Sequence, residues 1–160
     1  MTWAQAFRRQ AESEYGVYKW LSEKESALPT CHRLHALQMA TEKLAKSYMA
    51  GSDDVVPKKS HAVFEGFLRL IASNRDIRKR FGYEGRHEQF KATVYALLPF
   101  ARKVQSLAPS GELDQMNAEY PWQNAQQKVV CPADYGFPEF TKSELIRLAT
   151  FIDRFFAVIP

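Results

Sequence analysis

Apolar side chains recur at helical spacing through the first two thirds of the chain. The clearest stripe, between Thr30 and Gly51, carries Leu34, Leu37, Thr41, Leu44 and Tyr48. Because these residues alternate three- and four-residue steps, they share one face of a helix. We expect Thr30 to cap this helix at its N-terminus and Gly51 to end it.

A similar pattern predicts an earlier helix from Thr2 to about Glu25, with Thr2 as its N-cap. The residue before Pro29 is pushed out of helical geometry, so the helix stops by then. The buried side of this helix is expected to carry Trp3, Phe7, Ala11, Val17, Tyr18 and Leu21.

A charged turn over 52–59 precedes a third predicted helix, which Ser60 should cap. Its inward side is expected to carry Val63, Phe64, Phe67, Leu68 and Ile71. Residues 74–85 then indicate a basic helix end followed by a turn at two glycines. A fourth helix is predicted from near Arg86 to Leu107, with a kink at Pro99, whose ring nitrogen donates no hydrogen bond.

The segment 109–140 has no helical period but is rich in aromatic residues, so we expect it to pack on the helices rather than to be disordered. Residues 128–131 are expected to form a short extended piece. A capping box over Thr141 to Glu144 begins a last predicted helix that ends near Ile159.

These elements predict an all-α fold, an antiparallel bundle of about five helices. We expect one domain over 1–160, with a four-helix core over 1–107, a packed loop over 108–140 and a C-terminal helix over 141–159. The chain shows neither a membrane span nor a signal peptide, so we expect a cytoplasmic protein without membrane contact, whose Cys31 and Cys131 are free thiols.

The net charge of +4 is unevenly placed. Between Arg75 and Lys91 the chain has six basic residues and three acidic ones, whereas between Glu112 and Glu139 it has five acidic residues and one lysine. The first stretch can therefore attract phosphate and the second cannot.

The string 37–46, LQMATEKLAK, resembles the second helix of HEPN domains, which are helical bundles found in RNA-cleaving toxins, in phage-defence proteins and beside nucleotidyltransferases. The resemblance covers about residues 3–107. His61 fits the histidine that such domains often place at the start of the third helix. The spacing from Arg80 to His87, with six residues between, fits the arginine and histidine of the ribonuclease members.

The resemblance implies a homodimer and, if the protein is an enzyme, a metal-independent endoribonuclease of a toxin–antitoxin or defence system. Arg80 would stabilise charge on the phosphate, and His87 would move the proton. Phe81 departs from the family, because active members usually follow the arginine with a small polar residue. This departure favours an alternative: a non-catalytic accessory subunit that binds a partner protein encoded nearby.

The basic residues also predict RNA or nucleotide binding without catalysis. The predicted phosphate contacts are Arg75, Arg78, Lys79, Arg80 and Arg86. Phe81 and Tyr83 could add stacking on bases. The plainer alternative is a solvated charged surface, which the interspersed acidic residues favour.

Three other groups of residues have a functional and a structural interpretation. Cys31, His32 and His35 lie on one helical turn, but without the spacings of zinc sites we expect no metal and no cofactor, and a buried Cys31.

Glu42 and Lys46 are interpreted as a surface ion pair or a dimer contact. Tyr120 and Trp122 are candidates for a protein-interaction site or, more simply, for a loop anchor.

Overall fold

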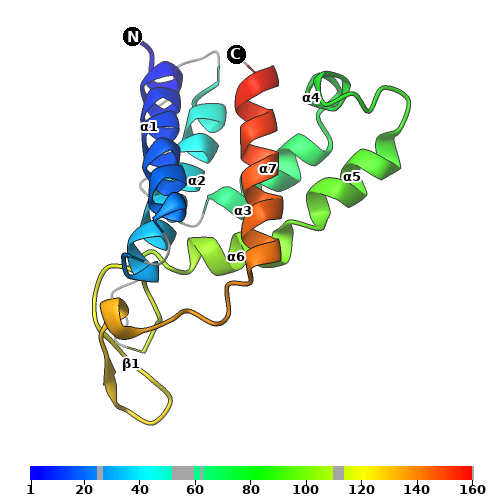
Figure 1. The fold of residues 1–160 in the computed structure, drawn as a ribbon. Helices are drawn as coiled ribbons and strands as arrows, with labels where there is room; N and C mark the ends of the chain where they lie inside the picture. The colour runs from blue at the N-terminus through cyan, green and yellow to red at the C-terminus, as the bar shows by residue number, and fades with distance from the viewer. Residues whose placement is uncertain (25–26, 52–59, 62, 110–113, 160) are drawn as a thin grey trace.

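Helices form most of the regular structure in the computed structural model, which describes residues 1–24, 27–51, 60–61, 63–109 and 114–159. Within these ranges the helices are α1 (Trp3–Glu23), α2 (Thr30–Ala50), α3 (Phe64–Ala72), α4 (Arg75–Arg80), α5 (His87–Tyr95), α6 (Leu98–Gln105) and α7 (Lys142–Val158) (Figure 1). The predicted all-α class is confirmed. The turn predicted over 52–59 and the acidic residue Glu112 lie outside the described residues.

The helices α1 and α2 form an antiparallel pair (Figure 1). Thr2 caps α1 in a capping box with Gln5, as its sequence position predicts. The expected stripe of α2 is buried or half-buried along its whole length. Thr30, however, is the first helical residue and not the cap, because Pro29 holds the N-cap position and makes no side-chain capping bond.

The buried face of α1 differs from the predicted one. Trp3 and Val17 are each 45% exposed, and Tyr15 is buried instead. Tyr15 follows Ala11 by four residues and precedes Tyr18 by three, which is helical spacing on one face. The hydroxyl of Tyr15 also forms a hydrogen bond to α7, which the spacing of apolar residues could not predict.

The middle of the chain is more broken than predicted. The five residues expected on the inner side of α3 are all buried, but the helix starts after Val63, and Ser60 is not its cap. α4 is a separate helix. The predicted fourth helix divides into α5 and α6, because Pro99 begins the new helix in its first turn, where its missing N–H has no partner to lose. Pro99 therefore marks a break rather than a kink.

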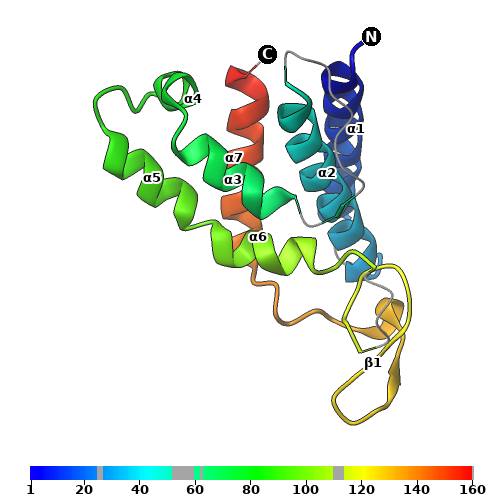
Figure 2. The same cartoon turned by 180° about the vertical axis from the view of Figure 1, so that it is seen from behind.

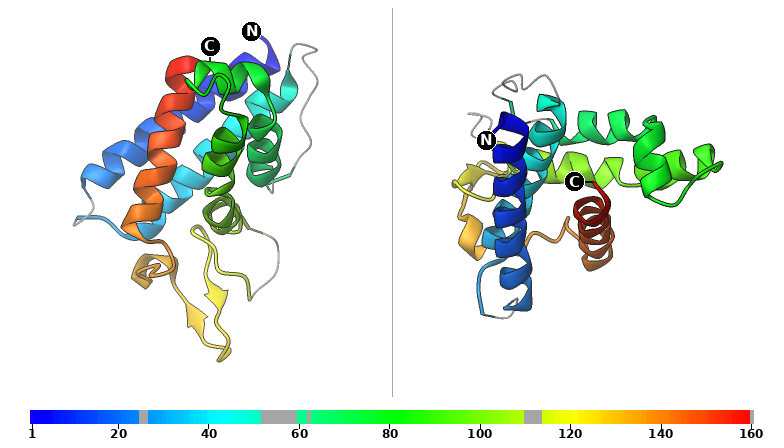
Figure 3. Two further views of the ribbon diagram at one scale, coloured as in Figure 1. Left: turned by 90° about the vertical axis from the view of Figure 1, so that its right-hand side faces the viewer. Right: turned by 90° about the horizontal axis from the view of Figure 1, so that it is seen from above.

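The helix α7 lies between α1 on one side and α3 with the α4–α5 turn on the other (Figures 2 and 3). Its Thr141 capping box is present as predicted. Toward α1, the Tyr15 hydroxyl donates to the carbonyl of Ala149 at 2.9 Å. Toward α3, the rings of Phe155 and Phe67 meet edge to face at 5.3 Å. α7 therefore joins the pair α1 and α2 to the helices α3 to α6 through one core.

The segment before α7 packs on the bundle, as its aromatic content predicts. Its regular pieces are the antiparallel strands β1 (Trp122–Gln123) and β2 (Val129–Val130) and the short 3-10 helix η1 (Pro132–Asp134). β2 lies in the predicted extended piece. Phe137 and Phe140 are buried, and Phe140 contacts Phe100 of α6 edge to face at 5.7 Å.

Candidate nucleic-acid interface

A positively charged surface occupies α4 and the turn that leads to α5, at a corner of the molecule far from the N-terminus of α1 (Figures 1 and 3). We name it the basic corner, and it consists of Arg75, Arg78, Lys79, Arg80, Arg86 and His87. All of these residues are exposed except Arg78, which is half-buried.

The backbone of the basic corner is anchored by one polar and two apolar side chains. The Asn74 side chain accepts hydrogen bonds from the amides of Asp76 at 2.9 Å and Ile77 at 3.0 Å, so it caps α4. Its Nδ2 donates to the hydroxyl of Tyr48 on α2 at 2.9 Å. Ile77 and Phe81 are buried in the core. Anchored in this way on one side, α4 presents its arginines on the other.

Two glycines form the turn between α4 and α5, at the positions where the sequence predicts it. Gly82 and Gly85 have φ angles of +69° and +72°, values that other residues rarely adopt. Between them the amide of Tyr83 donates to the carbonyl of Arg78 at 3.0 Å. The turn brings the start of α5, with His87, back toward α4.

The arginines of the basic corner have no carboxylate partner among the residues that the structure describes. Within the described part of the chain, none of Arg75, Arg78, Arg80 and Arg86 forms an ion pair, whereas Lys79 lies 3.4 Å from Glu84 and Nε2 of His87 lies 3.6 Å from Glu88. Of the other arginines, Arg8 pairs with Glu12, and both Arg69 and Arg102 pair with Glu65. Arg9, Arg147 and Arg154 have no carboxylate partner among the described residues. The basic corner thus keeps positive charge that is free to bind an anion.

His87 lies beside Arg78 and not beside Arg80. Its Nδ1 is 2.6 Å from Nη1 of Arg78, whereas Nη1 of Arg80 donates to the carbonyl of Val158 at the end of α7, at 3.1 Å. No hydrogen bond joins Arg80 to His87 in the part of the chain described. Because a guanidinium group only donates, Nδ1 of His87 accepts and the ring carries its proton on Nε2. The arginine of the basic corner that touches this histidine is therefore Arg78.

The two aromatic residues of the turn differ in what they can offer. Phe81 is buried, so the prediction that it stacks on bases is wrong. Tyr83 is half-buried, and the guanidinium carbon of Arg86 lies 5.0 Å from its ring centre. Arg154 of α7 lies 5.3 Å from the ring centre of Phe81 and donates to the Phe81 carbonyl at 2.5 Å. The sequence pattern offered no reason to place Arg154 here, since it comes from the last helix.

A second group of charges lies inside the bundle, on α2. Glu42 is only 2% exposed, and its carboxylate accepts hydrogen bonds from Lys46 at 2.6 Å and from Nδ1 of His61 at 2.7 Å. Gln38 at 3.1 Å and Lys43 at 3.3 Å add two more. The interpretation of Glu42 and Lys46 as a surface ion pair is therefore wrong.

Burial by itself raises the pKa of the Glu42 carboxyl, but the hydrogen bonds from Lys46 and His61 outweigh burial and lower this pKa to about 2. The carboxyl is therefore ionised at neutral pH. We name Glu42, Lys46, His61 and Gln38 the buried ionic cluster. Its contacts are made within one chain, and its histidine reaches solvent with a side chain that is 56% exposed.

The remaining candidate residues divide between buried and exposed positions. Trp122 is buried and meets the ring of Tyr135 edge to face at 5.3 Å, as a loop anchor would. Tyr120 is 54% exposed. Cys31 is buried as expected, Cys131 is exposed, and both are free thiols.

In the ranges that the structure describes, no three histidine, cysteine or acidic side chains are grouped as a metal site would require. No helix in these ranges has the length and apolar character needed to cross a bilayer. A scan against protein-family models, a search of curated proteins and a search of solved structures each found no match.

Proposed function

We propose that this protein is a HEPN-like module that binds RNA or a nucleotide through its basic corner. One observation carries the proposal: four arginines lie together at this corner without a carboxylate partner among the described residues, whereas Arg8, Arg69 and Arg102 each have one. Such a surface attracts phosphate groups, and guanidinium groups bind them through two parallel hydrogen bonds. Tyr83 beside Arg86 offers a ring on which a base can stack.

Binding of a labelled single-stranded RNA at several salt concentrations tests the proposal. In the double variant Arg75→Gln/Arg78→Gln we expect weaker binding, and a salt slope that falls by roughly 0.7 for each phosphate that the variant no longer neutralises. The matched control is Arg69→Gln/Arg102→Gln, which removes the same charge from two arginines that Glu65 already neutralises. Equal losses in both variants would mean that only net charge matters, and binding that does not respond to salt would contradict the proposal.

A second candidate function is metal-independent RNA cleavage at the same corner. The contact between Arg78 and His87 supports it, because a phosphate held by Arg78 would lie within reach of the imidazole. To donate a proton to a leaving oxygen, His87 would first have to take up a second proton and release Arg78 from Nδ1, because only the imidazolium is an acid of suitable strength. Arg80, which the family resemblance selects, would have to release the Val158 carbonyl before it could bind the phosphate.

Incubation with total RNA in the presence of EDTA tests cleavage. We expect the wild type to cut and the His87→Ala variant to be strongly impaired, with Arg78→Gln impaired more than Arg80→Gln. Equal cleavage by the wild type and His87→Ala would indicate a contaminating nuclease and remove the proposed site. Salt-dependent binding without any cleavage would leave a binding module, and the absence of both would favour the accessory subunit, for which exposed Tyr120 is the candidate contact.

A further inference from the structure

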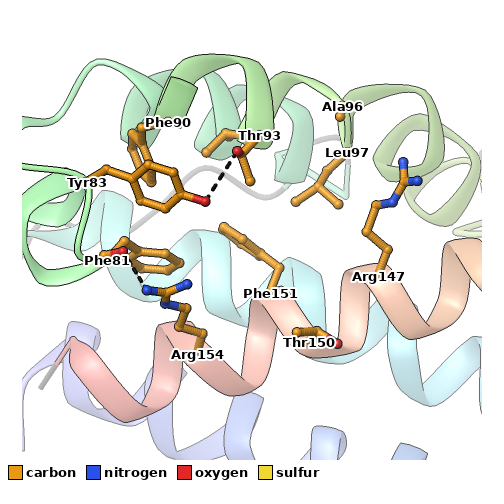
Figure 4. A pocket seen from close by; sticks show the side chains of 11 residues that line it. Phe81, Tyr83, Phe90, Thr93, Ala96, Leu97, Arg147, Thr150, Phe151 and Arg154 are labelled. Carbon is orange, nitrogen blue, oxygen red and sulfur yellow. Dashed lines mark hydrogen bonds between the residues drawn. The ribbon is translucent and has the colours of Figure 1, made fainter. Parts of the chain in front are cut away.

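A groove of about 420 Å³ lies between α5, the start of α6 and α7, next to the basic corner but separate from its phosphate-facing arginines (Figure 4). Its floor is apolar and its rim carries threonine and arginine side chains. The floor consists of Phe81, Phe90, Val94, Leu97 and Phe151, all of them buried in the core. The volume falls within the range of small-molecule sites, roughly 300 to 1,000 Å³.

One end of the groove is closed by an aromatic and cationic wall. The Tyr83 hydroxyl meets that of Thr93 at 3.4 Å, and Arg154 is held against Phe81 and Tyr83 by its bond to the Phe81 carbonyl (Figure 4). This arginine already has partners, so it forms part of the wall. An apolar or aromatic group that enters here meets rings on one side and a flat guanidinium group on another.

The opposite end carries a free positive charge. Arg147 is exposed and lines the groove, and it forms no hydrogen bond or ion pair with any other described residue. The residues that line the groove include two arginines and no carboxylate. Arg147 and Arg154 are seven residues apart on α7, which corresponds to about 10 Å along the helix axis. Figure 4 shows them at the two ends of the groove, with Phe151 between them.

We propose that this groove binds a small amphipathic carboxylate, with the carboxylate on Arg147 and an apolar body about 10 Å long over Phe151 and Leu97, ending at Tyr83 and Arg154. The charge of the rim selects an anion, and the apolar floor selects a body with few polar atoms. A nucleotide fits this floor less well, because the polar edges of its base would face phenylalanine, valine and leucine side chains. The groove shares Tyr83 with the proposed RNA site, but Arg147 and Phe151 lie outside the basic corner, so variants at Arg147 test the groove without altering the arginines proposed to bind RNA.

Calorimetric titration with octanoate and decanoate, below their micelle-forming concentrations, tests the proposal. We expect both to bind, and decanoate to bind roughly 15-fold more tightly because it buries two more methylene groups. The Arg147→Gln variant should bind either carboxylate at least tenfold more weakly and should bind neutral octanol as the wild type does. Arg147→Lys should recover part of the loss. Arg9→Gln, which removes an exposed arginine of α1 outside the groove, should change nothing.

A second variant blocks the groove without removing charge. Thr150 is exposed on its rim, so Thr150→Trp should fold, as circular dichroism would verify, and should abolish binding of both carboxylates. No decanoate binding to the wild type, or undiminished binding to either groove variant, would overturn the proposal. Displacement of decanoate by AMP at lower concentration, dependent on Arg147, would assign the groove to a nucleotide instead. A wild-type dimer in sedimentation that Thr150→Trp dissociates would assign it to a second copy of the chain.

Discussion

The buried ionic cluster and the basic corner are both groups of charged side chains, but they differ in burial and in whether their charges are paired. In the cluster, a carboxylate that is 2% exposed has hydrogen bonds from a lysine, a histidine and an amide. In the corner, three exposed arginines and the half-buried Arg78 have no carboxylate partner among the described residues. The first arrangement satisfies its own charge. The second leaves positive charge that an anionic ligand can pair with.

This difference indicates which charges serve the fold and which serve binding. A buried charge must be paired, because an uncompensated charge in the core costs several kcal/mol. An exposed arginine has no such requirement, and its contribution to stability is close to zero. Charge that is compensated and buried therefore marks a structural element, whereas charge that is uncompensated, exposed and locally concentrated marks a surface that binds an anion.

The largest expected effect comes from breaking the buried ionic cluster. Glu42→Gln removes the carboxylate but leaves Lys46 buried without its partner, so we expect the free energy of unfolding to fall by about 3 to 5 kcal/mol. Urea denaturation measures this. The matched control is Glu65→Gln, which removes a carboxylate that is bound by two arginines but lies nearer the surface, and should cost far less. Equal losses would contradict the structural role assigned to Glu42.

A double variant sharpens this result. Glu42→Gln/Lys46→Met removes the carboxylate together with the ammonium that lies nearest to it, so that only Lys43, 3.3 Å from the carboxylate and 14% exposed, loses its partner. We expect it to be more stable than Glu42→Gln alone. A double variant that is less stable would show that Lys46 stabilises the fold through its alkyl chain or through other contacts.

The pH dependence of stability is a further test of the buried ionic cluster. The pKa of Glu42 is about 2 in the folded protein and near its usual 4.5 when unfolded, so the unfolded state binds more protons at acidic pH. The stability due to the ionised carboxyl is thus complete above about pH 4.5 and is lost as the pH falls toward 2. Urea midpoints measured over this range should drop more steeply for the wild type than for Glu42→Gln/Lys46→Met. Parallel curves would contradict the lowered pKa of Glu42.

The sequence predicted the helices well where one residue pattern decides the structure. The stripe of α2 and the capping boxes at Thr2 and Thr141 are local signals, and the structure has all three. The break at Pro99 was predicted only as a kink, because a proline in a helical pattern can bend one helix or start another. Only the packing of α5 and α6 against α3 decides between the two.

The candidate site was predictable in composition but not in geometry. The density of basic residues identified α4 and the turn after it, and the glycine turn was expected at Gly82 and Gly85. The contact of His87 with Arg78 could not be predicted, because it depends on how this turn folds. The burial of Glu42 was also missed, since an i, i+4 pair on α2 looks the same whether its face is covered or exposed.

A smaller effect is expected from the turn that supports the basic corner. An alanine at Gly85 would have space, but its φ of +72° is unfavourable for a side chain, so Gly85→Ala should cost about 1 kcal/mol of stability. Gly16→Ala, in the middle of α1 with open space around it, should instead stabilise by roughly 0.5 to 1 kcal/mol. Thermal unfolding of both variants measures the contrast. Stabilisation by Gly85→Ala would mean that the turn adopts another backbone conformation.

The smallest expected effect on stability comes from the basic corner itself. Arg75→Gln/Arg78→Gln removes two charges that have no carboxylate partners among the described residues, so the free energy of unfolding should change by less than about 0.5 kcal/mol. Arg69→Gln/Arg102→Gln should lower it more, because Glu65 then loses both of its cations, Arg69 on the same helix and Arg102, which joins α3 to α6. For RNA binding the order should reverse, with the first variant impaired and the second close to wild type. Arginines that matter for binding and not for stability are what a ligand surface requires, whereas a large loss of stability from Arg75→Gln/Arg78→Gln would make the basic corner part of the fold.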